Sequence, residues 1–256
     1  MRAVTAVIFD WAGTTVDHGS LAPVRTLQSL FRAHGMEVSE AEARRDMGIH
    51  KKDHIRALLD AKTGGPPREE LVEQWFAQFI PMQMECLAAY SAVIPGVPEA
   101  VQRLRARGIR VGSTTGYTRP MLDLLLERAA AEGYTPDCAL CPDDTAAGRP
   151  LPWMCYLNAV RLGTYPMHSM VKVGDTISDI QEGLNAGMWT VGVARTGNMI
   201  GLSAEALAAL SPAAQSALLA GARSRLREAG AHYVIDSVRD LDLDPIELRL
   251  ERGERP

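Results

Sequence analysis

The chain has 256 residues, of which 46% are apolar, 23% are charged and 5% are aromatic. A chain of this length and composition can bury a sizeable core, which excludes a disordered, collagenous or fibrous protein. Its formal net charge of −4 at pH 7 gives no general attraction for polyanions. We therefore expect neither nucleic acid nor a membrane surface as a partner, and local groups must hold any anionic ligand.

The apolar segments and the cysteines bound the protein further. No apolar run approaches the roughly 20 residues of a membrane-spanning helix. The N-terminal apolar run is interrupted by Asp10 and has no small-residue cleavage site, unlike a secretory leader. Four scattered cysteines do not make a disulfide scaffold, so we expect reduced thiols in a cytoplasmic protein. Cys138 and Cys141 are interpreted as small buried residues rather than as a metal or redox pair.

Short runs rich in β-branched residues alternate with helical patterns over most of the chain. The predicted strands are 3–9, 109–113, 139–140, 170–174, 189–193 and 232–235. The predicted helices are 98–107, 118–132, 152–162, 178–186 and 203–229. Strands separated by helices predict βαβ units and an α/β fold with a doubly wound parallel sheet, a Rossmann-like core.

The alternation stops between residues 20 and 94. Three helical stretches are predicted there instead, at 21–35, 39–62 and 68–91. We therefore expect a core made of residues 1–19 and 95–256, interrupted by an α-helical cap domain at 20–94. The first helix carries an apolar stripe at Leu27, Leu30 and Phe31, which fits either packing within the cap or a protein interface.

Polar side chains follow several of the predicted strands. Asp10 ends the first strand, Ser113–Tyr117 form a hydroxyl-rich turn, and Asp175 and Asp179 follow the fourth strand. Arg149 lies in a loop. Each taken alone fits a helix cap, a turn or a solvated side chain. Because ligands bind beyond the carboxyl ends of parallel strands, the set together predicts a site for a divalent cation and a phosphoryl group.

This set of motifs resembles the haloacid dehalogenase-like hydrolases over the whole core. The resemblance implies that Asp10 is a nucleophile and that Thr115 and Arg149 bind the phosphoryl oxygens. It also implies that Asp10, Asp175, Asp179 and the backbone carbonyl of Ala12 hold Mg²⁺. Phosphatases of this superfamily have a second Asp two residues after the nucleophile, where this chain has Ala12. A missing general acid typically costs about 10²- to 10⁴-fold in rate, so a leaving group other than an alkoxide is expected.

The cap contains a candidate for activating such a leaving group. Residues 44–54 include Lys51, Lys52, His50 and His54, which from composition alone would be a solvated basic helix face. A lysine with its ordinary pKa of about 10.4 is charged at pH 7, but burial or a neighbouring cation favours the neutral amine. A neutral amine can form an imine, and an imine accepts the electrons of a carbon that leaves phosphorus.

With this lysine included, the motifs resemble the phosphonatase branch of the superfamily in both core and cap. The segments that carry the resemblance are 10–17, 47–54, 112–118, 147–153 and 173–179. It implies hydrolysis of the carbon–phosphorus bond of phosphonoacetaldehyde to acetaldehyde and phosphate, through a Schiff base on Lys51 and an aspartyl-phosphate on Asp10.

The same resemblance assigns further residues. It places His54 in proton transfer, and it implies a homodimer that forms through the cap. His50 and Ser20 depart from the expected pattern, which has an apolar residue and a cysteine there. The pocket residues that it implies are Met47, Gly48, Thr115, Gly116, Tyr117 and Arg149.

Two other functions remain open at this point. A phosphomonoesterase or phosphomutase on the same scaffold would use the basic cap only for binding, and Ala12 argues against it. A module that has lost catalysis is the other alternative, and the intact Asp10, Asp175 and Asp179 argue against that.

Overall fold

The computed structural model describes residues 3–256. Residues 1 and 2, which begin the predicted core segment 1–19, lie outside the described residues. One six-stranded sheet has the order β3-β2-β1-β4-β5-β6, and every pairing in it is parallel. The predicted doubly wound parallel sheet is confirmed. Its strands are β1 (Ala6–Phe9), β2 (Arg110–Thr114), β3 (Cys138–Leu140), β4 (Met170–Gly174), β5 (Trp189–Val193) and β6 (Tyr233–Ile235).

Strand β1 is apolar throughout because helices cover both of its faces. Val7 and Phe9 belong to the cluster that includes residues of α5 (Val97–Ala106) and α6 (Arg119–Ala131). Ala6 and Ile8 pack on the other face, against α7 (Trp153–Leu162). Helix α8 (Ile177–Asn185) packs against β4 and β5, and α10 (Pro212–Glu228) packs against β5 and β6.

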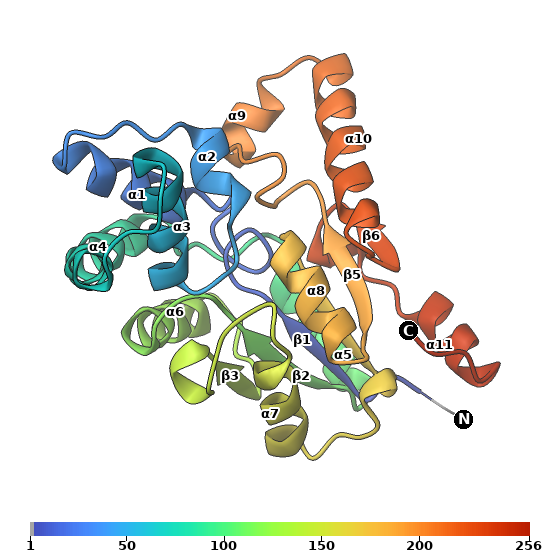
Figure 1. The fold of residues 1–256 in the computed structure, drawn as a ribbon. Helices are drawn as coiled ribbons and strands as arrows, with labels where there is room; N and C mark the ends of the chain where they lie inside the picture. The colour runs from blue at the N-terminus through green and yellow to red at the C-terminus, as the bar shows by residue number, and fades with distance from the viewer. Residues whose placement is uncertain (1–2) are drawn as a thin grey trace.

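The segment between β1 and α5 forms helices, which Figure 1 shows gathered to one side of the sheet. We call residues 20–94 the helical insert. The prediction of one continuous helix over 39–62 was wrong. That stretch ends at Arg45 and resumes at Lys51, because Gly48 has a φ of 95°, which no right-handed helix accommodates. The helices are α1 (Leu21–Ala33), α2 (Glu40–Arg45), α3 (Lys51–Thr63) and α4 (Glu69–Ala89).

The apolar stripe of α1 packs inside the insert. Leu27, Leu30 and Phe31 are fully buried, and the Phe31 ring meets the Trp75 ring of α4 edge to face at 4.8 Å. These three side chains are therefore part of the insert's own core and are not available to another protein chain.

The C-terminal region differs from prediction in two details. The stretch 203–229 splits into α9 (Ala204–Ala208) and α10, because the Ser211 side chain caps α10 and Pro212 begins it. Helix α11 (Asp244–Glu251) was not predicted. Short 3₁₀ helices cover Pro142–Asp144, Met167–Ser169 and Val238–Asp240. All four cysteines are free thiols, as expected. Within residues 3–256, none of the helices has the length and apolar character needed to cross a bilayer.

Candidate active site

Two central strands deliver carboxylates to the same edge of the sheet. Strands β1 and β4 are neighbours, and the chain continues from them to opposite sides, which makes this the topological switch point. Asp10 follows β1, and its amide donates to the Val173 carbonyl at 2.9 Å. Asp175 follows β4, and Asp179 lies in the first turn of α8. These three acids therefore lie at one edge of the sheet, as the sequence predicts.

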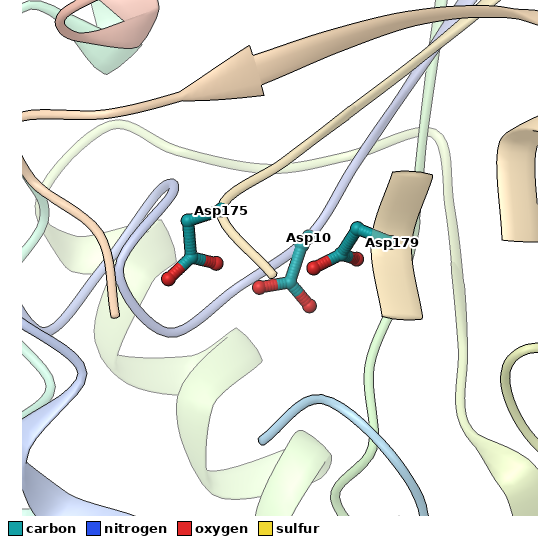
Figure 2. A group of neighbouring side chains, drawn as sticks. All are labelled: Asp10, Asp175 and Asp179. Atoms are coloured by element: carbon teal, nitrogen blue, oxygen red, sulfur yellow. The ribbon is translucent and has the colours of Figure 1, made fainter. Parts of the chain in front are cut away.

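Asp10, Asp175 and Asp179 form a compact buried cluster. One carboxylate oxygen from each lies within 4.8 Å of the others, and Figure 2 shows the three groups turned toward a common space. Asp175 accepts hydrogen bonds from the Thr14 hydroxyl at 3.1 Å and the Asn198 amide at 2.7 Å. Asp179 also forms a capping box with Thr176, so its position is set by the start of α8.

Arg149 is buried against this cluster rather than free in its loop. Its Nη1 lies 2.8 Å from an Asp10 oxygen and 3.0 Å from an Asp179 oxygen. Its Nε donates to Glu182 at 2.9 Å, and its Nη2 donates to the Thr114 hydroxyl at 2.7 Å. These contacts fix the guanidinium beside the Asp10 carboxylate.

Two residues that sequence reasoning missed, Lys172 and Glu182, support this arrangement. Lys172 of β4 is fully buried, and its Nζ lies 3.0 Å from both Asp179 and Glu182 and 2.7 Å from the Thr114 hydroxyl. A lysine inside an otherwise apolar strand was the available signal, since lysines are seldom buried without partners. Glu182 could have been found from its position one helical turn after Asp179.

The cluster has the charge and donor types that suit a divalent cation. Burial and the charge of Asp179 raise the pKa of Asp10, and burial with the charges of Asp10 and Asp179 raises the pKa of Asp175 well above its usual value. Carboxylates outnumber cations among the described residues that form the cluster: Asp10, Asp175, Asp179 and Glu182 against Arg149 and Lys172. An excess of two negative charges on hard oxygen donors fits one divalent cation.

A narrow cavity lies between this edge of the sheet and the insert. From the core, Asp10 and Arg149 line it, and from the insert, Lys51 does. His54, Asp175 and Asp179 do not line it, although all three are buried nearby or behind it. The other predicted site residues that line the cavity are Ala12, Met47, Gly48, Thr115, Gly116 and Tyr117, and Ser20, Pro23 and Thr176 join them.

Lys51 is the first residue of α3 and is 3% exposed. Its Nζ lies 3.6 Å from the Met47 sulfur and 5.4 Å from the centre of the Tyr117 ring. Burial lowers the pKa of Lys51 to about 8, and Arg149 acts in the same direction, whereas Asp10 and Asp175 oppose them. Lys52 lies elsewhere, paired with Glu69 and Glu73 of α4. Lys51 alone of these two lysines therefore offers an amine to the cavity.

The turn before α3 brings Lys51 to the cavity because two glycines permit close contact. A Cβ on Gly48 would lie 2.4 Å from the Thr176 hydroxyl, at a φ that side chains rarely adopt. A Cβ on Gly116 would lie 2.5 Å from the Ile49 carbonyl oxygen, so the core loop and the insert turn touch backbone to backbone. The glycines therefore define how far the insert reaches into the core.

His54 lies one turn after Lys51 on α3 and is fully buried. Neither of its ring nitrogens has a hydrogen-bond partner that meets standard geometry within residues 3–256. Burial lowers the pKa of His54 to about 3, with the charge of Lys51 adding to the effect and the Ala43 backbone opposing it. The imidazole is therefore neutral near pH 7.

Three features define the class of protein: the parallel strands β1 and β4, the buried acid cluster at their ends, and the helical insert that covers it. A family model described as haloacid dehalogenase-like hydrolase matches residues 4–187.

Two similar sequences and one similar crystal structure refine this assignment. The phosphonoacetaldehyde hydrolase of Nitratidesulfovibrio vulgaris is 47% identical over 99% of this chain and 94% of its own length. The protein of the same name from Bacillus cereus is 44% identical over 98% of both chains. A crystal structure of a phosphonoacetaldehyde hydrolase-like protein from Oleispira antarctica matches with a TM-score of 0.95 and 43% identity, over 99% of this chain and 96% of that one. The chain therefore belongs to the phosphonoacetaldehyde hydrolase family of the haloacid dehalogenase-like hydrolases.

Proposed function

We propose that this protein hydrolyses the carbon–phosphorus bond of phosphonoacetaldehyde, giving acetaldehyde and phosphate. The observation that carries the proposal is the placement of the Lys51 amine and the Asp10 carboxylate in one cavity, with the pKa of Lys51 lowered to about 8. A shift from 10.5 to about 8 increases the neutral amine at pH 7 by about 300-fold. Ala12 supports the same function, because an enamine carbon leaves without an acid at that position.

Lys51 and Asp10 divide the chemistry between them. The Lys51 nitrogen adds to the aldehyde carbon and water leaves, which gives a protonated imine. An Asp10 oxygen then bonds to phosphorus while the phosphorus–carbon bond breaks, and that electron pair forms the carbon–carbon double bond of an enamine. The enamine carbon takes up a proton, and water releases acetaldehyde from Lys51 and phosphate from Asp10.

The surrounding residues bind and orient the substrate. Thr115 and Arg149 hold the phosphonate oxygens, and Met47, Gly48, Gly116 and Tyr117 enclose the aldehyde end. We assign proton transfer near Lys51 to His54, which lies one turn later on α3 and whose neutral imidazole has one nitrogen that accepts a proton and one that donates.

Asp10, Asp175, Asp179 and the Ala12 carbonyl would hold Mg²⁺. When bound there, the ion would supply positive charge that offsets the repulsion between the Asp10 carboxylate and the phosphonate dianion. Both oxygens of Asp179 already have protein partners, Thr176 on one side and Arg149 with Lys172 on the other. Both oxygens of Asp175 also have partners, but these are the neutral Thr14 hydroxyl and Asn198 amide. Asp179 is therefore the acid of the two whose charge is already offset by paired cations.

Borohydride trapping tests this function. Reduction during turnover should attach the substrate carbons covalently to Lys51, which peptide mass spectrometry locates. Lys51→Arg should lose both the adduct and phosphate release, because a guanidinium does not form the imine. Lys52→Arg is the matched control and should keep both, since Lys52 pairs with Glu69 and Glu73. Undiminished turnover in Lys51→Arg, or an adduct on Lys52, would rule the proposal out.

Three further properties belong to the same proposal. Residues 20–94 form a cap domain on a core of residues 1–19 and 95–256, and the cap closes over the substrate. The protein is cytoplasmic and forms a homodimer through the cap. Because Leu27, Leu30 and Phe31 are buried within the insert, such a dimer must use other cap residues. The molar mass in solution, measured by light scattering, tests the dimer, and a monomer at micromolar concentration would contradict it.

A further inference from the structure

A second contact between insert and core lies at the end of α2, outside the cavity. The Arg44 guanidinium donates from Nη1 to the Gly19 carbonyl at 2.9 Å and to the Asn198 side-chain oxygen at 3.0 Å. Its Nη2 donates to the Gly201 carbonyl at 2.8 Å. One insert side chain thus binds both the linker that leaves β1 and the loop that follows β5.

Asn198 connects this contact to the acid cluster. Its side-chain amide donates back to the Arg44 carbonyl at 3.2 Å, so the two residues bind each other reciprocally. Its backbone amide donates to Asp175 at 2.7 Å. Asn198 is 4% exposed, so water does not readily replace these bonds. The same residue therefore touches the insert with its side chain and a carboxylate of the cluster with its backbone.

The linker that Arg44 binds contains two residues in an unusual backbone conformation. Asp17 and Ser20 have φ values of 54° and 51°, in the left-handed region that residues other than glycine rarely adopt. Such conformations persist where the surroundings hold them in place. Arg44 contributes to this by binding the Gly19 carbonyl between them, with the Ser20 carbonyl also within 3.5 Å.

We propose that Arg44 is a positioning residue that couples docking of the insert to the orientation of Asp175 through Asn198. The insert carries Lys51, so the coupling ensures that the acid cluster is complete when the amine is in place. This inference rests on the proposed function in the role of Lys51 and in the cation site that includes Asp175. By linkage, a cation on the acid cluster stabilises the docked insert to the same extent that docking strengthens cation binding.

Direct binding of Mg²⁺ to the metal-free protein, measured by calorimetry without substrate, tests the coupling. Arg44→Ala should weaken binding about three- to tenfold, at or below the lower end of the roughly 10- to 100-fold that direct partners of metal ligands contribute, because Arg44 acts one residue further out, through Asn198. Arg45→Ala is the matched control, because Arg45 is exposed and pairs with its neighbour Asp46. Its affinity should stay within about twofold of the unchanged protein. Equal affinities in Arg44→Ala and Arg45→Ala would overturn the proposal.

A double-mutant cycle separates coupling from a general loss of structure. Asn198→Ala removes the side-chain bonds with Arg44 and keeps the backbone amide that reaches Asp175. If one path connects them, Arg44→Ala and Asn198→Ala together should weaken Mg²⁺ binding by less than the product of the single effects. Arg44→Lys, which keeps the charge without the forked donors, should recover part of the affinity. Strictly multiplicative effects, or no recovery in Arg44→Lys, would contradict the assignment.

Hydrogen exchange gives the reciprocal readout. In the unchanged protein, Mg²⁺ should slow exchange of the α2 peptide that covers residues 40–46, and in Arg44→Ala this response should disappear. An undiminished response would overturn the coupling. Neither experiment uses phosphonoacetaldehyde, so a failure of the proposed reaction and a failure of the coupling give different results.

Discussion

On the core side of the cavity, the Arg149 guanidinium is paired with Asp10, Asp179 and Glu182, and the Lys172 amine with Asp179 and Glu182. On the insert side, the Lys51 amine lies near a thioether and over an aromatic ring. Both sides are buried, and both contain basic groups. They differ in whether each buried basic group has an acidic partner that compensates its charge.

The difference has a direct chemical meaning. Ion pairs keep Arg149 and Lys172 charged, and the pKa of each is raised despite burial. A thioether and an aromatic face compensate an ammonium group only weakly, so the pKa of Lys51 falls to about 8. The core side thus provides fixed charges for an anion, and the insert side provides a nucleophilic amine near neutral pH.

Replacing Asp10, the nucleophile of the proposed reaction, should separate the two sides most strongly. Asp10→Asn should reduce phosphate release by roughly 10³-fold or more, because an amide cannot form the phosphorylated intermediate. Borohydride should still trap the substrate on Lys51. The trapped adduct should keep its phosphorus, whereas the unchanged enzyme should also yield an ethyl adduct formed after cleavage.

The matched control is Asp53→Asn, an exposed acid two residues after Lys51 on α3. It should leave both trapping and phosphate release within about twofold. Loss of trapping in Asp10→Asn with retained trapping in Asp53→Asn would show that the two sides do not act independently.

Removing a charged side chain should destabilise the protein on the core side of the cavity and stabilise it on the insert side. Glu182→Gln should lower the free energy of unfolding by about 3 to 5 kcal/mol, because it leaves Lys172 and Arg149 with too few partners in the core.

Lys51→Met should instead stabilise the protein at pH 7 by up to about 3 kcal/mol, since it removes a buried amine whose pKa lies below that of the unfolded chain. Urea unfolding measures both, and Glu37→Gln at the exposed pair with Arg32 should change stability by less than about 1 kcal/mol.

The pH dependence gives a second check on Lys51→Met. Between about pH 8 and 10.5 the unfolded chain binds a proton at Lys51 that the folded protein does not. The stability contribution of Lys51 therefore rises with pH in this window, and the advantage of Lys51→Met should shrink. A constant advantage from pH 7 to 10.5 would show that Lys51 is not destabilised by burial.

A carboxylate placed beside the Lys51 amine should make the insert side resemble the core side, where each basic group is paired with an acid. Met47→Glu places a carboxylate where the sulfur now lies 3.6 Å from the Lys51 amine. The pH midpoint of borohydride trapping should rise from near 8 by about 1 to 3 units, because an adjacent opposite charge favours the ammonium form. Met47→Gln, of similar size and without charge, should keep the midpoint near 8; an equal shift in both variants would refute this explanation.

Much of the fold was predictable because its signals are local. The alternation of apolar runs and helices is enough to predict a doubly wound parallel sheet, and Asp10 at the end of the β1 run is enough to predict an acid at the sheet edge. The errors also have local causes. Gly48 terminates a helical pattern that otherwise continues through 39–62, and Ser211 and Pro212 divide 203–229. A glycine within a helical pattern is tolerated often enough that it does not by itself predict a break.

The sequence by itself determined which residue types stand at the strand ends, that an acid is missing at Ala12, and that a lysine-rich stretch lies in the insert. The resemblance already implied Lys51, and the tertiary structure added that Lys51 lines the cavity while Lys52 pairs with Glu69 and Glu73. The tertiary structure alone decided that Lys172 and Glu182 hold Arg149 beside Asp10. The physical reason is that residue identity and spacing are properties of the chain. Burial and charge pairing, by contrast, depend on segments that meet only after folding, and they set the pKa of each basic group.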